Sequence, residues 1–81
     1  VVLASDLNIA GSLSSTSGRL DAYTQTPTVS YIGLEAQTIG SGLYLDDKIH
    51  QLTIDNAVGV TLNADITVND LLTINNSKKL T

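Results

Sequence analysis

Four short triplets of the same pattern dominate the second half of the chain. Each places a threonine between two aliphatic residues: Leu52-Thr53-Ile54, Val60-Thr61-Leu62, Ile66-Thr67-Val68 and Leu72-Thr73-Ile74. This alternation is typical of a β-strand with one buried face. The triplets begin at positions 52, 60, 66 and 72, so three steps lead from one Leu-Thr-Ile triplet to the next. The spacing predicts a parallel β-solenoid with three short strands and about 20 residues per turn, whose turns stack about 4.8 Å apart.

Composition supports an all-β chain and excludes several classes of protein. The 81 residues have a formal charge of −4 and only four Lys or Arg, too few to neutralise a run of phosphates, which excludes a nucleic-acid-binding surface. Cys is absent, so no disulfide supports a small core. No apolar run approaches the roughly 18 residues of a membrane span, and no signal peptide is recognisable. Met is also absent, and we expect a processed product or a window on a longer polypeptide.

An internal repeat links the beginning of the chain to its end. Residues 1–22 align with residues 60–81 at an offset of 59, which is close to three turns of the predicted length. The identities are Val1 with Val60, Leu3 with Leu62, Asp6 with Asp65 and Leu13 with Leu72. Residues 23–51 are less regular and contain Pro27, which lacks a donor for a strand ladder. We therefore expect one solenoid segment over residues 1–81, of about four turns, with a less regular insert at 23–51.

Part of this pattern resembles a repeat of long secreted bacterial surface proteins. The resemblance rests on Gln37-Thr38-Ile39-Gly40, on the stretch 50–69 and on Leu72-Thr73-Ile74, with residues 1–22 as a more diverged copy. Those proteins are parallel β-helix adhesins and filaments, often exported by the type IX route. At Asn75-Asn76-Ser77-Lys78 this chain departs from the Gly-rich bend usual in the family. The resemblance implies a right-handed solenoid at the cell surface or outside the cell, and it specifies architecture more strongly than function.

The triplets also predict which residues face inward and which face outward. The predicted structural core comprises Leu52, Ile54, Val60, Leu62, Ile66, Val68, Leu72 and Ile74. The predicted outward array comprises Thr53, Thr61, Thr67 and Thr73. A turn of this length places Leu52 against Leu72 inside the coil, and it places Thr53 against Thr73 outside. A regular threonine grid is able to bind ice, yet threonine also has a high β propensity, and the first copy of the repeat lacks threonine at these positions.

Polar residues at the predicted corners have two interpretations. Asp55-Asn56, Asn69-Asp70 and Asn75-Asn76 carry oxygens that are able to coordinate Ca²⁺. The same residue types also satisfy the backbone of tight turns, and stacked asparagines form ladders inside a solenoid. The second interpretation is favoured, because the chain contains no Gly- and Asp-rich calcium repeat. We therefore predict no metal site.

The middle segment offers weaker candidates. Asp46-Asp47 with His50 suggests acid–base catalysis, but single His, Arg and Glu residues scattered over the chain favour a solvated loop. Tyrosines are able to stack on sugars, but the intervals between Tyr23, Tyr31 and Tyr44 do not match the predicted turn. We therefore predict no catalytic residue, no cofactor-binding residue and no cofactor.

The repeat architecture favours a structural role over an enzymatic one. We expect a repeat segment of an extracellular filament, stalk or adhesin, with copies of itself, flanking repeats of the same chain, or surface glycans as partners. The alternative is an ice- or carbohydrate-binding solenoid module; a fragment of a polysaccharide-degrading β-helix enzyme is a weaker one. Both ends of the chain fall within predicted strands that carry no cap. We therefore expect continuation in the same polypeptide or end-to-end stacking of copies.

Overall fold

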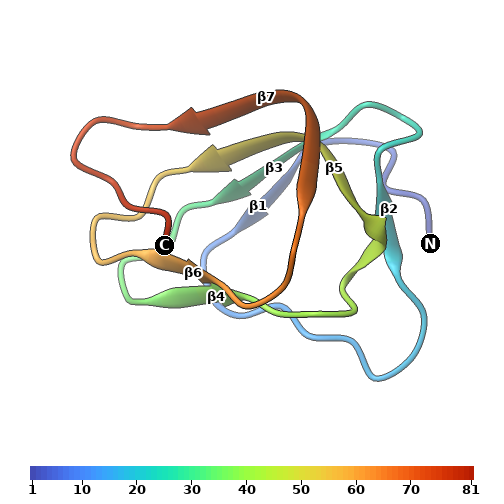
Figure 1. Cartoon of the computed structure of the whole chain (residues 1–81), viewed down its shortest axis with the longest axis horizontal. Coiled ribbons are helices and arrows are strands. Elements are labelled where there is room, and N and C mark those ends of the chain that lie inside the picture. The colour runs from blue at the N-terminus through green and yellow to red at the C-terminus, as the bar shows by residue number, and fades with distance from the viewer.

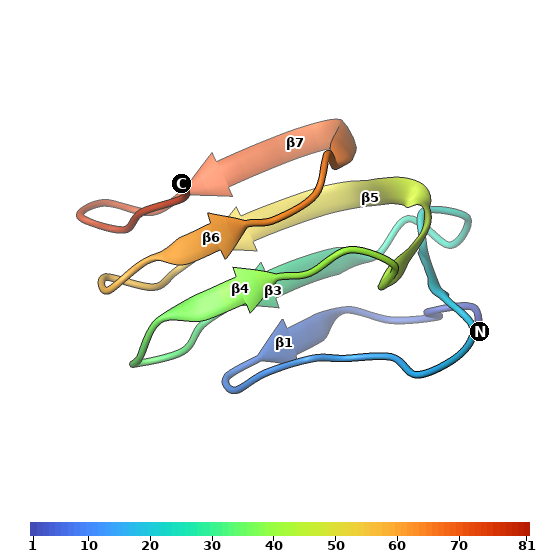
Figure 2. The same ribbon diagram turned by 60° about the horizontal axis from the view of Figure 1, so that its bottom comes forward.

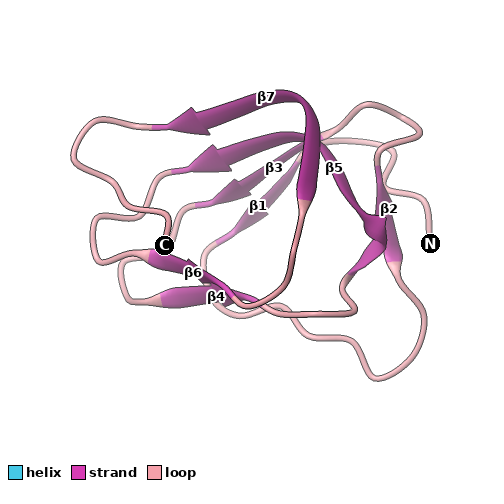
Figure 3. Cartoon of the chain, in the orientation of Figure 1, coloured by secondary structure: helices cyan, strands magenta, loops and turns pink.

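The computed structural model describes all residues, 1–81, and consists of strands and loops without any helix (Figure 3). The strands are β1 (Leu7–Ile9), β2 (Leu20–Ala22), β3 (Thr28–Tyr31), β4 (Gln37–Ile39), β5 (Tyr44–Ile54), β6 (Val60–Leu62) and β7 (Thr67–Ile74). Every strand pair is parallel. The predicted all-β parallel β-solenoid is therefore confirmed.

The coil has three walls, each built from strands of successive turns (Figures 1 and 2). The first wall stacks β1, β3, the end of β5 and the end of β7. The second wall stacks β4 and β6, and an isolated bridge adds Leu80 above Val60. The third wall stacks Val2, β2 and the first part of β5. The long strands β5 and β7 run through the third wall and bend into the first, and the coil makes about three turns, not the four expected.

The last turn has the length that the triplets predict. Leu52 pairs with Leu72, which confirms the predicted spacing. The earlier turns are longer, because Leu7 pairs with Val29 and Val29 pairs with Leu52, so the position in the chain advances by 22 and then by 23. Part of the extra length lies in β5, where residues 45–48 bulge between two consecutive pairings with β2. The middle segment, 23–51, forms the second turn of the coil.

The ladder also shows how the two ends of the chain relate. Leu7 lies in the same column as Leu72, through Val29 and Leu52. The sequence alignment of residues 1–22 with 60–81 instead matched Leu72 with Leu13, one strand step later. The two aligned segments therefore run along different walls. All three walls carry the same apolar–polar–apolar pattern, so similarity between segments does not identify the wall.

Aliphatic side chains and two tyrosines fill the interior of the coil. The buried apolar residues are Ile9, Ala22, Val29, Tyr31, Ile39, Leu43, Tyr44, Ile49, Leu52, Ile54 and Val60. Leu62, Ile66 and Val68 are half-buried against this core. Leu72 and Ile74 differ from their predicted place in the core, because they are 44% and 46% exposed. They belong to the last rung of the first wall, so no strand covers their upper side.

Candidate functional site

The upper end of the coil is formed by β7 and the loops on either side of it, and no strand lies above β7 (Figure 2). β7 pairs with β5 and with no other strand. Leu52 and Ile54 occupy the same columns one rung below and are only 2% and 0% exposed. The exposure of Leu72 and Ile74 therefore comes from the missing rung above them and not from an outward orientation.

The lower end of the coil is open in the same way. β1 pairs only with β3, and the half-buried Leu7 and Leu13 face the end of the core. A hollow of about 190 Å³ opens at the lower end of the corner between the second and third walls, where residues 13–20 line it. We call this corner of the coil, residues 13–20, 40–43 and 63–66, the hollow corner. Its apolar lining consists of Val1, Leu13, Leu20 and Leu43. Both ends of the coil therefore expose apolar surface beside an unpaired strand edge.

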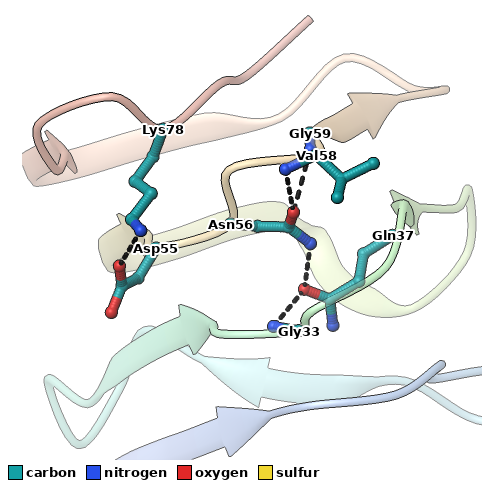
Figure 4. A network of polar contacts seen from close by, with 7 residues as sticks. All are labelled: Gly33, Gln37, Asp55, Asn56, Val58, Gly59 and Lys78. Carbon is teal, nitrogen blue, oxygen red and sulfur yellow. Dashed lines mark hydrogen bonds and ion pairs between the residues drawn. The ribbon is translucent and has the colours of Figure 1, made fainter.

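The corner between the first and second walls is held by a buried side-chain amide, Gln37 (Figure 4). We call it the polar corner (residues 9–12, 32–37, 55–59 and 75–79). Gln37 is 6% exposed, and its Nε2 donates to the carbonyls of Ile9 and Gly11, both at 2.8 Å. Its Oε1 accepts from the N–H of Gly33 at 2.8 Å and from Nδ2 of Asn56 at 3.0 Å. Every donor and acceptor of this amide is therefore engaged.

Asn56 continues these contacts upward from the second turn to the third. It is fully buried, and its Nδ2 also donates to the carbonyl of Glu35 at 2.7 Å. Its Oδ1 accepts from the N–H groups of Val58 and Gly59 at 2.9 and 2.8 Å, and its carbonyl accepts from the N–H of Lys79 at 3.2 Å. Gln37 and Asn56 thus form one polar spine that connects all turns at this corner. The spine adds side-chain hydrogen bonds to the backbone contacts between turns where the chain bends. Throughout the chain, every buried side-chain polar atom has a hydrogen-bond partner.

The local sequence explains why the spine fits. A Cβ at Gly33 would lie 2.6 Å from the side-chain amide carbon of Gln37, so only glycine leaves room for that amide. Gly59 has a φ of 133°, a conformation that favours glycine, where the chain leaves the Asn56 turn. The sequence marked Asn56 as a ladder residue but missed the inward role of Gln37. The available signal was its alternation with the inward Ile39, which places a polar residue in an inward position.

The other predicted corner residues lie on the surface. Asp55 lies 3.6 Å from Nζ of Lys78, and both side chains are partly exposed (Figure 4). Asp70 accepts a hydrogen bond from Nε2 of Gln51 at 2.6 Å. Exposed Asn75 accepts the N–H of Lys78 through its carbonyl at 3.0 Å and closes a turn. These contacts are those of turn and surface residues, and no three His, Asp or Glu side chains converge on one point.

The predicted threonine array is divided among the walls. Thr53 pairs with Thr73 on the outside of the first wall, as predicted from the spacing of the triplets. Thr61 pairs with Thr38 on the second wall, and Thr67 pairs with Lys48 on the third. The column of Thr53 continues downward through Ser30 to Asn8. The four threonines thus lie on three different walls, Thr67 beside a lysine, and form no broad flat grid.

The third wall carries Asp46, Asp47 and His50, the residue types of acid–base chemistry in the middle segment. Asp46 and Asp47 lie in the β5 bulge, with φ values of 57° and 53°; Asp46 is exposed and Asp47 is half-buried. Nε2 of His50 lies 3.6 Å from Oδ2 of Asp70, which belongs to the next turn. His50 also lies beside the ring of Tyr23, at 6.1 Å between centroids, and the ammonium of Lys48 lies over that ring. The cluster ties neighbouring turns together on the surface. It lines neither the hollow of about 190 Å³ nor a second hollow of about 420 Å³, which is lined by residues 10–13, 35–38 and 40.

Two of the three tyrosines lie inside the core and form no platform for a sugar. Tyr31 and Tyr44 are 1% and 0% exposed, and their hydroxyl oxygens are 2.7 Å apart. Burial raises the pKa of both hydroxyls, most strongly that of Tyr44, because the buried phenolate would lose its hydration. The pair is therefore a neutral hydrogen bond between the first and third walls at the second turn.

Replacing one of these tyrosines tests that bond. Tyr31→Phe should lower the free energy of unfolding by about 1–3 kcal/mol, because the Tyr44 hydroxyl then has no partner. The double variant Tyr31→Phe/Tyr44→Phe should regain much of this loss, since neither polar group is left buried. Urea denaturation of the singles and the double measures the coupling. Strictly additive losses would contradict a direct bond.

Asp21 supports the end of β2 and gives the coil a pH dependence. Its carboxylate accepts hydrogen bonds from the hydroxyl of Thr24 at 2.6 Å and from the N–H groups of Thr24 and Tyr23 at 2.9 and 3.0 Å. These donors, the Thr24 hydroxyl first, hold the pKa of Asp21 below its ordinary value of 3.8. The turn after β2 is therefore built around the ionised carboxylate.

Acidification should consequently weaken the coil through Asp21. A lowered pKa in the folded state contributes stability that is fully present above the unfolded value of 3.8 and is lost as pH falls below it. Asp21→Asn should therefore flatten the decline in melting temperature below about pH 4 relative to the parent. Thermal melts of both proteins between pH 2.5 and pH 7, roughly the range of that transition, measure the difference. Parallel curves would contradict the role of the carboxylate.

Comparisons with protein-family models, with curated proteins and with solved structures give no match to this chain. The class of protein is therefore defined by the fold alone, a parallel β-solenoid with a polar spine along one corner. The structure contains no helix of the length and apolarity that crosses a membrane.

Proposed function

We propose that this chain is a structural repeat segment of an extracellular filament, stalk or adhesin, assembled by the stacking of solenoid turns. One observation carries the proposal: the strand ladder and the apolar core continue through every turn of the coil, up to the outermost rungs β1 and β7. Leu72 and Ile74 are nearly half exposed at the upper end. Such an end is stabilised by a further turn, either from flanking sequence or from another molecule.

The interior supports a mechanical role. The walls are continuous parallel ladders, and the spine of Gln37 and Asn56 fixes the register of successive turns at a corner. Load along the axis is therefore shared by hydrogen bonds in several columns. The ice-binding alternative is less well supported, because the outward threonines pair on separate walls. A carbohydrate platform is less well supported because two of the three tyrosines are buried.

The proposal is tested by joining copies of the chain in tandem. Residues 63–66 form the short connection between β6 and β7. A polar linker of similar length is therefore suitable for joining the last residue of one copy to the first residue of the next. Polypeptides with two and three copies should unfold in one cooperative transition, with a free energy of unfolding and an m-value that rise with copy number. Copies that unfold independently, at the midpoint of the single chain, would overturn the stacking role.

The location is tested separately. Antibodies against the chain should label intact cells of the source organism, and imaging of the labelled material should show filaments or stalks. Fibres of the purified protein should give an X-ray diffraction reflection at about 4.8 Å along the fibre axis, because the strands run perpendicular to that axis. Labelling only after the cells are broken open would contradict the extracellular assignment.

A further inference from the structure

The second wall has no strand beneath β4, and we propose that the chain itself supplies one. Residues 11–13, which we call the strap, move onto the lower edge of β4 and pair with it in parallel. The structure shows the strap in an open position, beside the second hollow, and the pairing is its closed position. The inference concerns a movement within one molecule, so it does not depend on the proposed stacking function.

The lower edge of β4 is unpaired, although the first turn of the chain passes beneath it (Figure 2). The N–H of Gln37 donates upward to the carbonyl of Gly59 at 3.0 Å. The carbonyl of Ile39 accepts from the N–H of Asn63, also above, at 3.0 Å. Successive residues of a strand direct their backbone groups to opposite edges, so the N–H and carbonyl of Thr38 face downward.

The missing pairing is confined to this wall. Between the first and second turns, β1 pairs with β3 on the first wall and β2 pairs with β5 on the third. No backbone hydrogen bond joins residues 36–40 to residues 10–18. Ala36, Thr38 and Gly40 instead line the second hollow. Free backbone groups at every second residue are the pattern that another extended segment satisfies.

The strap has the sequence pattern of this wall. Gly11-Ser12-Leu13 places a hydroxyl before an aliphatic residue, as do Gln37-Thr38-Ile39 and Val60-Thr61-Leu62, which pair with each other. Ser12 is exposed, and Leu13 is half-buried against the core. With Ser12 beneath Thr38, the closed strap continues both columns with the correct face inward.

The strap is already held on both sides. Nε2 of Gln37 donates to the carbonyl of Gly11 at 2.8 Å, so Gly11 lies beside Gln37 in the open position as well. Beyond the strap, the hydroxyl of Ser15 donates to the carbonyl of Gly18 at 2.8 Å and closes a small loop. Closure therefore orders only a short segment between fixed points, which keeps its entropic cost low.

Closure forms a short parallel ladder. In this register the N–H of Thr38 donates to the carbonyl of Gly11, which has a second lone pair available, and the N–H of Leu13 donates to the carbonyl of Thr38. The N–H groups of Gly11 and Gly40 then face the carbonyls of Ala36 and Leu13. All of these residues line the second hollow. The closed strap thus removes a strand edge that is able to accept a foreign strand.

Amide hydrogen exchange distinguishes the two positions. With the strap open, the N–H groups of Thr38 and Gly40 should exchange at the rate of unprotected amides, whereas closure should slow both by about tenfold or more. The N–H of Gln37 is the reference within the same strand, because its bond to Gly59 protects it in either position. Unprotected exchange at Thr38 and Gly40, with Gln37 protected, would overturn closure.

Gly11→Pro removes an N–H group that only the closed position uses. It keeps the carbonyl that binds Gln37, and a Cβ at this position meets no atom within 4 Å. Exchange at Thr38 should therefore become several-fold faster than in the matched control Gly11→Ala, which retains the N–H. Protection of the Gln37 amide checks folding in both variants. Equal exchange at Thr38 in the two variants would contradict the ladder.

Disulfide trapping tests the register, because the chain has no cysteine of its own. In the closed position the Cα atoms of Ser12 and Thr38 are about 4.8 Å apart, within the range of about 4.4–6.8 Å that a disulfide spans. Oxidised at low concentration, Ser12→Cys/Thr38→Cys should form its intramolecular disulfide several-fold faster than Ser14→Cys/Thr38→Cys. Ser14 is equally exposed but lies beyond the strap. Equal rates would show a mobile segment without register and would overturn the pairing.

Discussion

Ile54→Ala should lower the free energy of unfolding by about 2–5 kcal/mol, the usual cost of removing a fully buried isoleucine side chain. Ile54 lies in the first wall between Tyr31 below and Ile74 above, so its loss leaves a cavity that neighbours on both sides border. Urea denaturation of the single chain measures the effect, provided that the concentration is too low for association.

Ile74 supplies a matched control for this prediction. It is the same residue type in the same column, one rung higher, but 46% exposed. Ile74→Ala should therefore cost less than half as much in the monomer, and Thr61→Ser, on an exposed outward position, less again. In the assembled filament Ile74 would be covered, so its cost should rise toward that of Ile54. Equal losses for Ile54→Ala and Ile74→Ala in the monomer would contradict the open upper end.

Asn56→Ala should be similarly costly, at about 2–5 kcal/mol, although it removes no apolar side chain. The substitution leaves the N–H groups of Val58 and Gly59 and the carbonyl of Glu35 without their side-chain partner. Each unsatisfied buried group costs about 1–3 kcal/mol, and local rearrangement recovers part of the sum. Loss of amide-exchange protection at Val58 and Gly59 would locate the damage at the polar corner.

Asn75→Ala is the control for Asn56→Ala. Asn75 is exposed, and its contact within the turn uses the backbone carbonyl, which alanine retains. It should change the free energy of unfolding by less than about 0.5 kcal/mol. A comparable loss from the two variants would show that Asn56 acts through turn propensity and not through the spine.

The regular triplets predicted the fold because each places its apolar residues on one face. Leu52 and Leu72 stack as the spacing of the triplets requires. The length of the earlier turns was not predictable in this way, since residues 45–48 bulge out of β5 without changing the pattern on either side. The alignment of the chain ends failed to identify walls for a related reason: the same short pattern serves every wall.

The polar interior was only partly visible in the sequence. Asn56 follows a strand, which marks it as a corner residue, and asparagine is common in stacked ladders. Gln37 begins a strand, where its type alone does not reveal an inward side chain. Its amide fits inside the coil only because Gly33 has no Cβ, and no sequence pattern connects these two residues. The pairing of Tyr31 with Tyr44 likewise depends on two walls meeting at the same height. Such contacts follow from tertiary geometry and not from local periodicity.

The spine also makes the coil unequal around its axis. Along the polar corner, hydrogen bonds of two side-chain amides link each turn to the next, in addition to the backbone ladder. No comparable side-chain amides link the turns at the hollow corner. Rotation of one turn relative to the next would break several hydrogen bonds of Gln37 and Asn56 at once. The two amides therefore restrict twisting of the coil most strongly at this one corner.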